Sequence, residues 1–196
     1  MSSLKKHILP IVLIFCFLLL YIHNLSRSTY GGDVGDFLSA AVVMGVPHAP
    51  GYPLFTILGF ILSKFNFISP AFMIGLISAF SGAFGILFFY LLSFSFTKNK
   101  LISLISSSIL GFSYYYWFYS EVAEVFALNN LFAIALILVS VRYSITKNKR
   151  YLFLLSFLMG LSLTNHQTIL LLFPSILILT FTNLIKDLRN PKNIVF

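Results

Sequence analysis

The sequence predicts an all-α, multi-pass membrane protein, a bundle of about six transmembrane helices with shorter juxtamembrane helices on the outer side. Of its 196 residues, 59% are hydrophobic and 9% are charged, whereas soluble domains carry about 25% charged residues. Long apolar runs alternate with short basic clusters, as spans alternate with cytoplasmic loops. The net charge of +8 is concentrated in these clusters, so we expect a membrane lipid environment and no nucleic-acid partner.

Six apolar runs are the candidate spans. They cover residues 8–22, 70–96, 101–117, 122–141, 151–163 and 167–185. Because a span needs about 20 residues, the fifth run is short, and its end could extend into the polar stretch 164–167. The first run follows two lysines and no small-residue cleavage site comes after it. This favours a retained helix over a cleaved signal peptide.

A shorter apolar stretch, residues 53–66, decides the topology. If it stays on the outer side and the N-terminus is cytoplasmic, all 13 basic residues except Arg27 and Lys64 face the cytoplasm. If it crosses, most of these bases face outside instead. The positive-inside rule therefore favours six spans and two cytoplasmic termini. We expect residues 27–69 to form an outer loop, with a short amphipathic helix over 35–44 and with 53–66 as a juxtamembrane or re-entrant helix. Pro47, Pro50 and Pro53 exclude a regular helix over 47–53.

This topology places four of the five acidic residues on the outer face. Asp33 and Asp36 lie in the first outer loop, and Glu121 and Glu124 lie in the second. Carboxylates beside hydrocarbon are costly and are usually retained for function. Each pair is spaced i, i+3, so its members would share a face of a helix. Close carboxylates shift each other's pKa, which suits acid–base chemistry or metal binding; the alternative is a solubilising loop charge.

Two histidines are further candidates. His48 lies in a proline-rich stretch, residues 46–53, which would fix its side chain where it could hold a phosphate; a structural histidine is the alternative. Asn165 and His166 form the third outer turn, where helix capping is the alternative. The aromatic run 114–119 is typical of an interfacial belt. A phosphate-binding glycine motif, an H-E-x-x-H motif and a cysteine cluster are absent, which argues against a nucleotide-driven enzyme.

Four motifs occur in a fixed order along the chain. They are Gly32-Asp-Val-Gly-Asp-Phe37, His48-Ala-Pro-Gly-Tyr-Pro-Leu54, Glu121-Val-Ala-Glu-Val-Phe-Ala-Leu-Asn129 and Gly160-Leu-Ser-Leu-Thr-Asn-His166. Each is weak alone, but together, over about residues 28–185, the chain resembles a membrane family related to the protein O-mannosyltransferases. That family includes a vertebrate transmembrane enzyme that modifies plexin-type receptor domains.

The resemblance implies a GT-C glycosyltransferase fold and a function. Such enzymes transfer a sugar, here mannose-like, from a polyprenyl or dolichyl phosphate carrier to a protein hydroxyl outside the cytoplasm. Asp33 matches the general base best, with Asp36 as the alternative. The resemblance assigns no metal ligand. The residues it implies for binding the sugar donor or its carrier are His48, Tyr52, Glu121, Glu124, Asn129, Asn165 and His166.

The chain departs from the family in two ways. Phe126 stands where a tyrosine is usual, and family members are longer, so we expect this transmembrane module to be the N-terminal part of a longer protein. The resemblance places it in the plasma membrane of a bacterium or the endoplasmic reticulum of a eukaryote, with an extracytoplasmic active face. The rivals are a transporter or flippase module, with the acids as an ion relay, and a non-catalytic assembly subunit.

Overall fold

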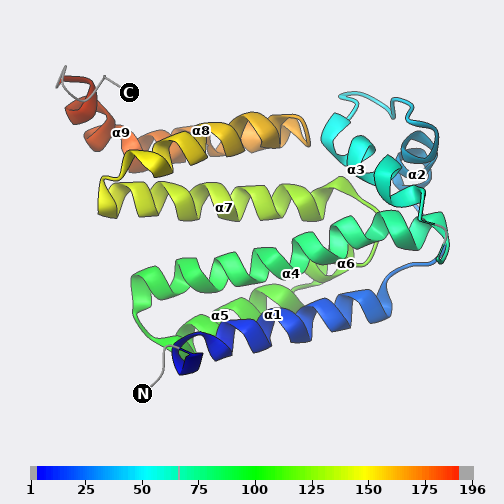
Figure 1. The fold of residues 1–196 in the computed structure, drawn as a ribbon, viewed down its shortest axis with the longest axis horizontal. Helices are drawn as coiled ribbons and strands as arrows, with labels where there is room; N and C mark the ends of the chain where they lie inside the picture. Colours follow the sequence, from blue (N-terminus) through cyan, green and yellow to red (C-terminus); the bar gives the residue numbers. More distant parts are fainter. Residues whose placement is uncertain (1–3, 66, 190–196) are drawn as a thin grey trace.

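The computed structural model describes residues 4–65 and 67–189, and the regular elements in this part of the chain are all helices, with no strand. The all-α prediction is confirmed. Figure 1 shows the arrangement of the elements. They are α1 (Leu4–Asn24), α2 (Val34–Val43), α3 (Pro53–Ser63), α4 (Pro70–Thr97), α5 (Lys100–Phe112), α6 (Tyr114–Ser120), α7 (Val125–Thr146), α8 (Lys149–Leu163), the 3-10 helix η1 (Gln167–Leu172) and α9 (Phe173–Arg189).

The long helices run side by side, and α4 lies at their centre. It packs against α1, α3, α5, α6 and α7, while α8 and α9 cover the other side of α7. The short helices α2 and α3 gather at one end of the bundle, opposite the end where α9 finishes (Figure 1). The four motifs of the sequence are distributed around this α2–α3 end.

Two of the described helices are long and apolar enough to cross a membrane, by length and composition. They are α4, with 28 residues, and α7, with 22 residues. The other apolar helices in the described ranges are shorter, so the six-span topology stays a prediction. The predicted span 101–117 is not one helix, because Ser113 adopts an extended conformation between α5 and α6. The predicted span 167–185 begins as the 3-10 helix η1.

Two turns with the same sequence fold the long helices back on themselves. Thr-Lys-Asn-Lys occurs at residues 97–100 and again at 146–149. In each turn the lysine ends one helix in the left-handed region, with φ of 53° at Lys98 and 59° at Lys147. The asparagine side chain then accepts a backbone N–H of the next helix, which satisfies a donor that the helix start leaves free. These caps define the α4–α5 and α7–α8 hairpins.

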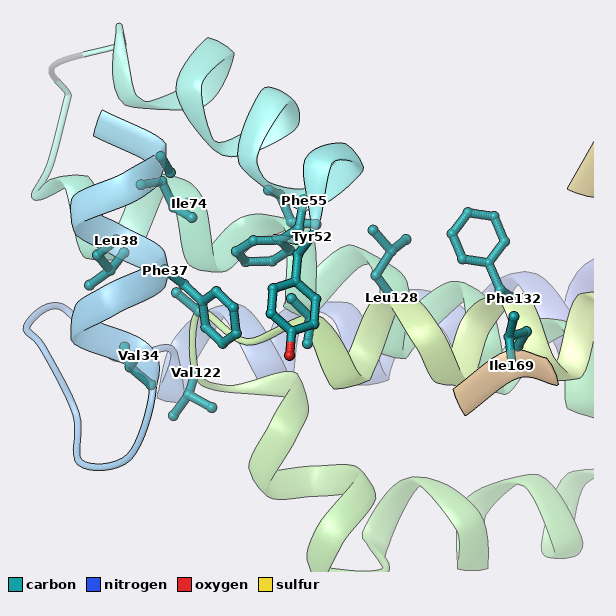
Figure 2. Packing of buried hydrophobic residues seen from close by; sticks show 14 of the residues in the cluster. Val34, Phe37, Leu38, Tyr52, Phe55, Ile74, Val122, Leu128, Phe132 and Ile169 are labelled. Carbon is teal, nitrogen blue, oxygen red and sulfur yellow. The ribbon is translucent and has the colours of Figure 1, made fainter. Parts of the chain in front are cut away.

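The first outer loop contains the two short helices that were expected there. Helix α2 packs on α3, and both contact α4. A Cβ added at Gly59 of α3 would lie 2.8 Å from the Ala41 side chain of α2, so the helices touch closely. Figure 2 shows their buried side chains, with Phe37 and Phe55 beside Tyr52. The α2–α3 pair is thus a packed unit that fixes the loop between its helices.

Candidate active site

Four segments that are distant in sequence meet at one end of the bundle. They are the start of α2, the loop before α3, the linker 121–124 between α6 and α7, and the turn between α8 and η1. The Leu54 backbone N–H donates to the Thr164 carbonyl at 3.0 Å, which ties α3 to the end of α8. Asn165 donates through Nδ2 to the Val125 carbonyl at 3.2 Å, which ties that turn to α7. One backbone bond and one side-chain amide bond therefore connect α3, the α8–η1 turn and α7.

Asp36 and His48 make the strongest polar contact of the site. Asp36 lies in the first turn of α2, and its Oδ2 accepts both the His48 backbone N–H at 2.8 Å and His48 Nδ1 at 2.7 Å. Chiefly because of the backbone bond, and also the ring bond, the pKa of Asp36 is held below its ordinary value. Asp36 thus pins the proline-rich loop to α2.

Asp33 approaches the same imidazole from its other edge. Its Oδ2 lies 3.8 Å from His48 Nε2. Asp33 precedes α2 as its N-cap residue, but its side chain makes no capping bond and is 65% exposed. The two predicted catalytic carboxylates therefore converge on His48, with Asp36 bound to it and Asp33 free to meet a ligand.

Tyr52 links this cluster to the α8–η1 turn. Its hydroxyl lies 3.3 Å from His48 Nε2, and its ring centroid lies 5.5 Å from that of His166. Burial, and then the negative charge of Asp33, raises the pKa of Tyr52. Tyr52 also has a φ of 42°, a costly conformation for a residue other than glycine. Figure 2 shows its hydroxyl directed away from Phe55. The strained backbone positions this side chain.

The structure separates the two glutamates. Glu124 is 5% exposed, and burial, followed by the charge of Asp33, raises its pKa to about 7. Glu121 is half-buried and lies beside Asn24 and Trp117, where burial raises its pKa as well. The expected shared helical face is wrong, because residues 121–124 form an irregular linker. Glu124 belongs to the Asp33–His48–Tyr52 cluster and Glu121 does not.

Ser78 of α4 fixes the backbone of Glu124. The Ser78 hydroxyl donates to the Glu124 carbonyl at 3.1 Å and accepts the Glu124 N–H at 3.3 Å. A serine inside an apolar run gave no functional signal in the sequence. This contact fixes the backbone of Glu124 and therefore the point from which its buried side chain extends.

The Asn165–His166 turn is held by two kinds of contact. Asn165 is buried and binds α7 as described, whereas His166 caps η1, accepting the Thr168 N–H at 3.1 Å through Nδ1. The sequence left helix capping open as the alternative role of this turn, and His166 is the residue that caps a helix here. An N–H only donates, so Nδ1 carries no hydrogen and the neutral ring presents Nε2–H. Burial lowers the pKa of His166, which favours this neutral form.

Aromatic rings that the sequence did not assign to the site line its inner side. Tyr119 lies 4.6 Å from Phe126, and Phe126 lies 5.4 Å from His166, between ring centroids. Tyr119 belongs to the run predicted to be an interfacial belt. That run divides in the structure: Tyr114 and Tyr115 are more than 70% exposed, whereas Tyr119 turns toward the site.

The groove beside α2 is separate from most of these side chains. It has a volume of about 740 Å³ and is lined by Arg27, Asp36, Val43 and Pro70, among others. Asp36 is the one predicted site residue that lines it. Within residues 4–65 and 67–189, no group of three or more histidine, cysteine, aspartate or glutamate side chains is placed to hold a metal ion.

Comparison with known proteins decides the family. Residues 33–189 match the model described as "Protein O-mannosyl-transferase TMEM260 N-terminal domain". The chain belongs to this family. The match begins at Asp33 and spans all the site segments described above, and it confirms the predicted resemblance to a family related to the O-mannosyltransferases.

Two curated relatives carry the TMEM260 name. The protein O-mannosyl-transferase of Dictyostelium discoideum is 32% identical over 187 residues, covering 86% of this chain and 23% of the relative. That of Mus musculus is 35% identical over 153 residues, covering 76% of this chain and 22% of the relative. The chain thus spans less than a quarter of the length of either relative. No solved structure matches it.

Proposed function

We propose that this chain forms the donor side of the active site of a protein O-mannosyltransferase with a GT-C-type fold. It would transfer mannose from a polyprenyl or dolichyl phosphate to a protein hydroxyl on the extracytoplasmic face. The TMEM260 family match supports the reaction class. The observation that carries the site assignment is the convergence of Asp33 and Asp36 on His48, beside Tyr52 and His166.

Asp33 is the general base of the proposed reaction. It takes the proton of the acceptor hydroxyl while the hydroxyl oxygen attacks the anomeric carbon. The bond from that carbon to the phosphate oxygen breaks, and the carrier phosphate leaves with the electron pair. A base of this kind contributes roughly 10²–10⁴-fold in rate. Asp36 is the poorer candidate because its Oδ2 already accepts two hydrogen bonds, which stabilise its unprotonated form.

Hydrogen-bond donors face the position of the leaving phosphate in this proposal. Since Asp36 can only accept, His48 Nδ1 carries a hydrogen, and His48 Nε2 becomes a donor when the ring is protonated. The Tyr52 hydroxyl and His166 Nε2–H are the other donors. Donors fixed in advance stabilise negative charge that develops on a leaving group. The required substrate is a lipid-phosphate-linked sugar, and the acceptor is a protein.

The position of the acids disfavours a transporter or flippase. An ion relay needs ionisable groups at membrane depth. Of the described helices, α4 and α7 are the two long and apolar enough to cross a membrane, and neither contains an acidic residue. Asp33 and Glu124 instead lie immediately before helices, as the N-cap residues of α2 and α7. This placement fits chemistry at a membrane surface.

Transfer of label tests the proposal. Membranes are prepared from cells that express the chain, either alone or within the longest reading frame that encodes it. These membranes are incubated with radiolabelled polyprenyl phosphate mannose. We expect label on protein serine or threonine, which β-elimination releases. A chain that supports flipping of the lipid across vesicles but no transfer from it would favour the flippase instead. Transfer without any effect of Asp33 or His48 substitutions would refute the site assignment.

A further inference from the structure

Buried oxygens without hydrogen-bond partners gather where α7 begins. The described part of the chain has four such atoms: Glu124 Oε2, Asn129 Oδ1 and Asn165 Oδ1 lie around this helix start, and Glu121 Oε1 lies beside α1. The side chain of Asn165 binds the Val125 carbonyl, next to Glu124, and Asn129 follows one turn along α7. A buried polar group without a hydrogen-bond partner destabilises the folded protein. Three such groups around one helix start indicate that a ligand supplies the missing partners.

The neighbours of the two amides fix which atom lacks a partner. Asn165 must turn its NH₂ toward the Val125 carbonyl, which only accepts. The Thr168 hydroxyl lies 2.8 Å from His166 Nδ1, and it must donate there because that nitrogen carries no hydrogen. The same hydroxyl therefore accepts from Asn129 Nδ2, at 3.2 Å. In both residues the unpartnered atom is the side-chain carbonyl oxygen, which is an acceptor. A ligand that satisfies these atoms must therefore supply hydrogen-bond donors.

Acceptors of this kind select hydroxyl groups and disfavour phosphate. A phosphate oxygen has no hydrogen to offer to the unpartnered amide oxygens, whereas the donors that a phosphate needs lie at His48, Tyr52 and His166. A sugar presents several hydroxyl donors around a ring with apolar faces. The aromatic wall of Tyr119, Phe126 and His166 adjoins the unpartnered oxygens. Aromatic walls with a few fixed polar groups are typical of small-molecule sites.

We propose that the start of α7 and the α8–η1 turn form the subsite that binds the hydroxyl groups of the transferred sugar. Glu124, Asn129 and Asn165 accept from these hydroxyls. The inference rests on the proposed transferase function and deepens it, because it places the sugar here and the phosphate at His48 and Tyr52. Phe126 and His166, the two rings next in sequence to Val125 and Asn165, are half-buried.

Binding of a donor that cannot react tests the subsite without requiring transfer. The probes are a short-chain polyprenyl phosphonate of mannose and its four monodeoxy analogues, and the measurement is Kd for the full chain in detergent. We expect at least one deoxy analogue to bind roughly ten- to 100-fold more weakly than mannose, the loss of one or two hydrogen bonds. Glu124→Met and Asn129→Ala should each weaken mannose binding and remove part of that discrimination.

Matched controls separate this inference from the proposed function. Lys64→Gln changes a residue outside the site, which lies over the Phe60 ring at 4.1 Å, and should leave every Kd unchanged. If the parent binds and transfers mannose but both variants keep full discrimination among the analogues, the subsite is wrong and the transferase stands. If the parent binds none of the lipid sugars, both the subsite and the proposed transferase function are wrong. If a divalent cation alone binds and depends on Glu124 and Asn129, the oxygens are a cation site and the inference is overturned.

Discussion

Glu124→Gln should change how the stability of the protein depends on pH. The pKa of Glu124 is raised from 4.5 to about 7 because its carboxyl is buried and lies near Asp33. The folded protein therefore holds this proton more tightly than the unfolded chain does. The stabilisation is fully present below the unfolded pKa and is lost as pH rises through the folded pKa. A difference of this size corresponds to roughly 3 kcal/mol.

The assay compares thermal unfolding midpoints in detergent from pH 4.5 to 8.5. Relative to the glutamine variant, the parent should lose roughly 3 kcal/mol of stability between about pH 4.5 and 7 and then level off. Asp33→Asn removes a cause of the raised pKa, so in that background the loss should begin and end at lower pH. Parallel curves for parent and variant would show that Glu124 titrates normally and has a partner in the folded protein.

Three further outcomes follow from the described contacts. In a protein with Cys16 replaced, the single substitutions Ser39→Cys and Lys64→Cys should each allow labelling from outside by a membrane-impermeant thiol reagent. If Lys64→Cys is labelled only after permeabilisation, residues 53–66 cross the membrane. Asp36→Ala releases the two bonds to His48, and should lower kcat about tenfold or more and expose the proline-rich loop to proteolysis; unchanged proteolysis would refute its positioning role. Gly59→Val should lower the free energy of unfolding by about 1–3 kcal/mol, whereas an unchanged free energy of unfolding would show that α2 and α3 do not touch.

Much of the architecture could be predicted because apolar runs and prolines act locally. Of the proline-rich residues 47–53, 47–52 form the expected non-helical loop, and Pro53 is the first residue of α3. The short helices 34–43 and 53–63 also lie where the sequence placed them. Composition could not show that Ser113 interrupts an apolar run, since a single extended residue leaves hydropathy unchanged.

The sequence named residues that the structure brings together, but it did not indicate the contacts between them. The ordered motifs named Asp33, His48, Glu124 and His166, which the structure brings together. Sequence spacing suggested that Glu121 would accompany Glu124, but the linker is irregular and turns the two apart. Asp36 is hydrogen-bonded to His48, which lies 12 residues away in the sequence, and no local sequence pattern predicts that bond.

The most direct test is the rate of mannose transfer by Asp33→Asn. Asparagine keeps the shape of aspartate but cannot take a proton at neutral pH, so we expect a loss of roughly 10²–10⁴ in kcat with folding and donor binding retained. Lys64→Gln is the control, since Lys64 lies over the Phe60 ring at 4.1 Å, outside the site, and should keep its rate. A large loss in Asp36→Asn with a mild one in Asp33→Asn would reassign the base. Near-normal transfer by both variants would show that neither carboxylate is the base.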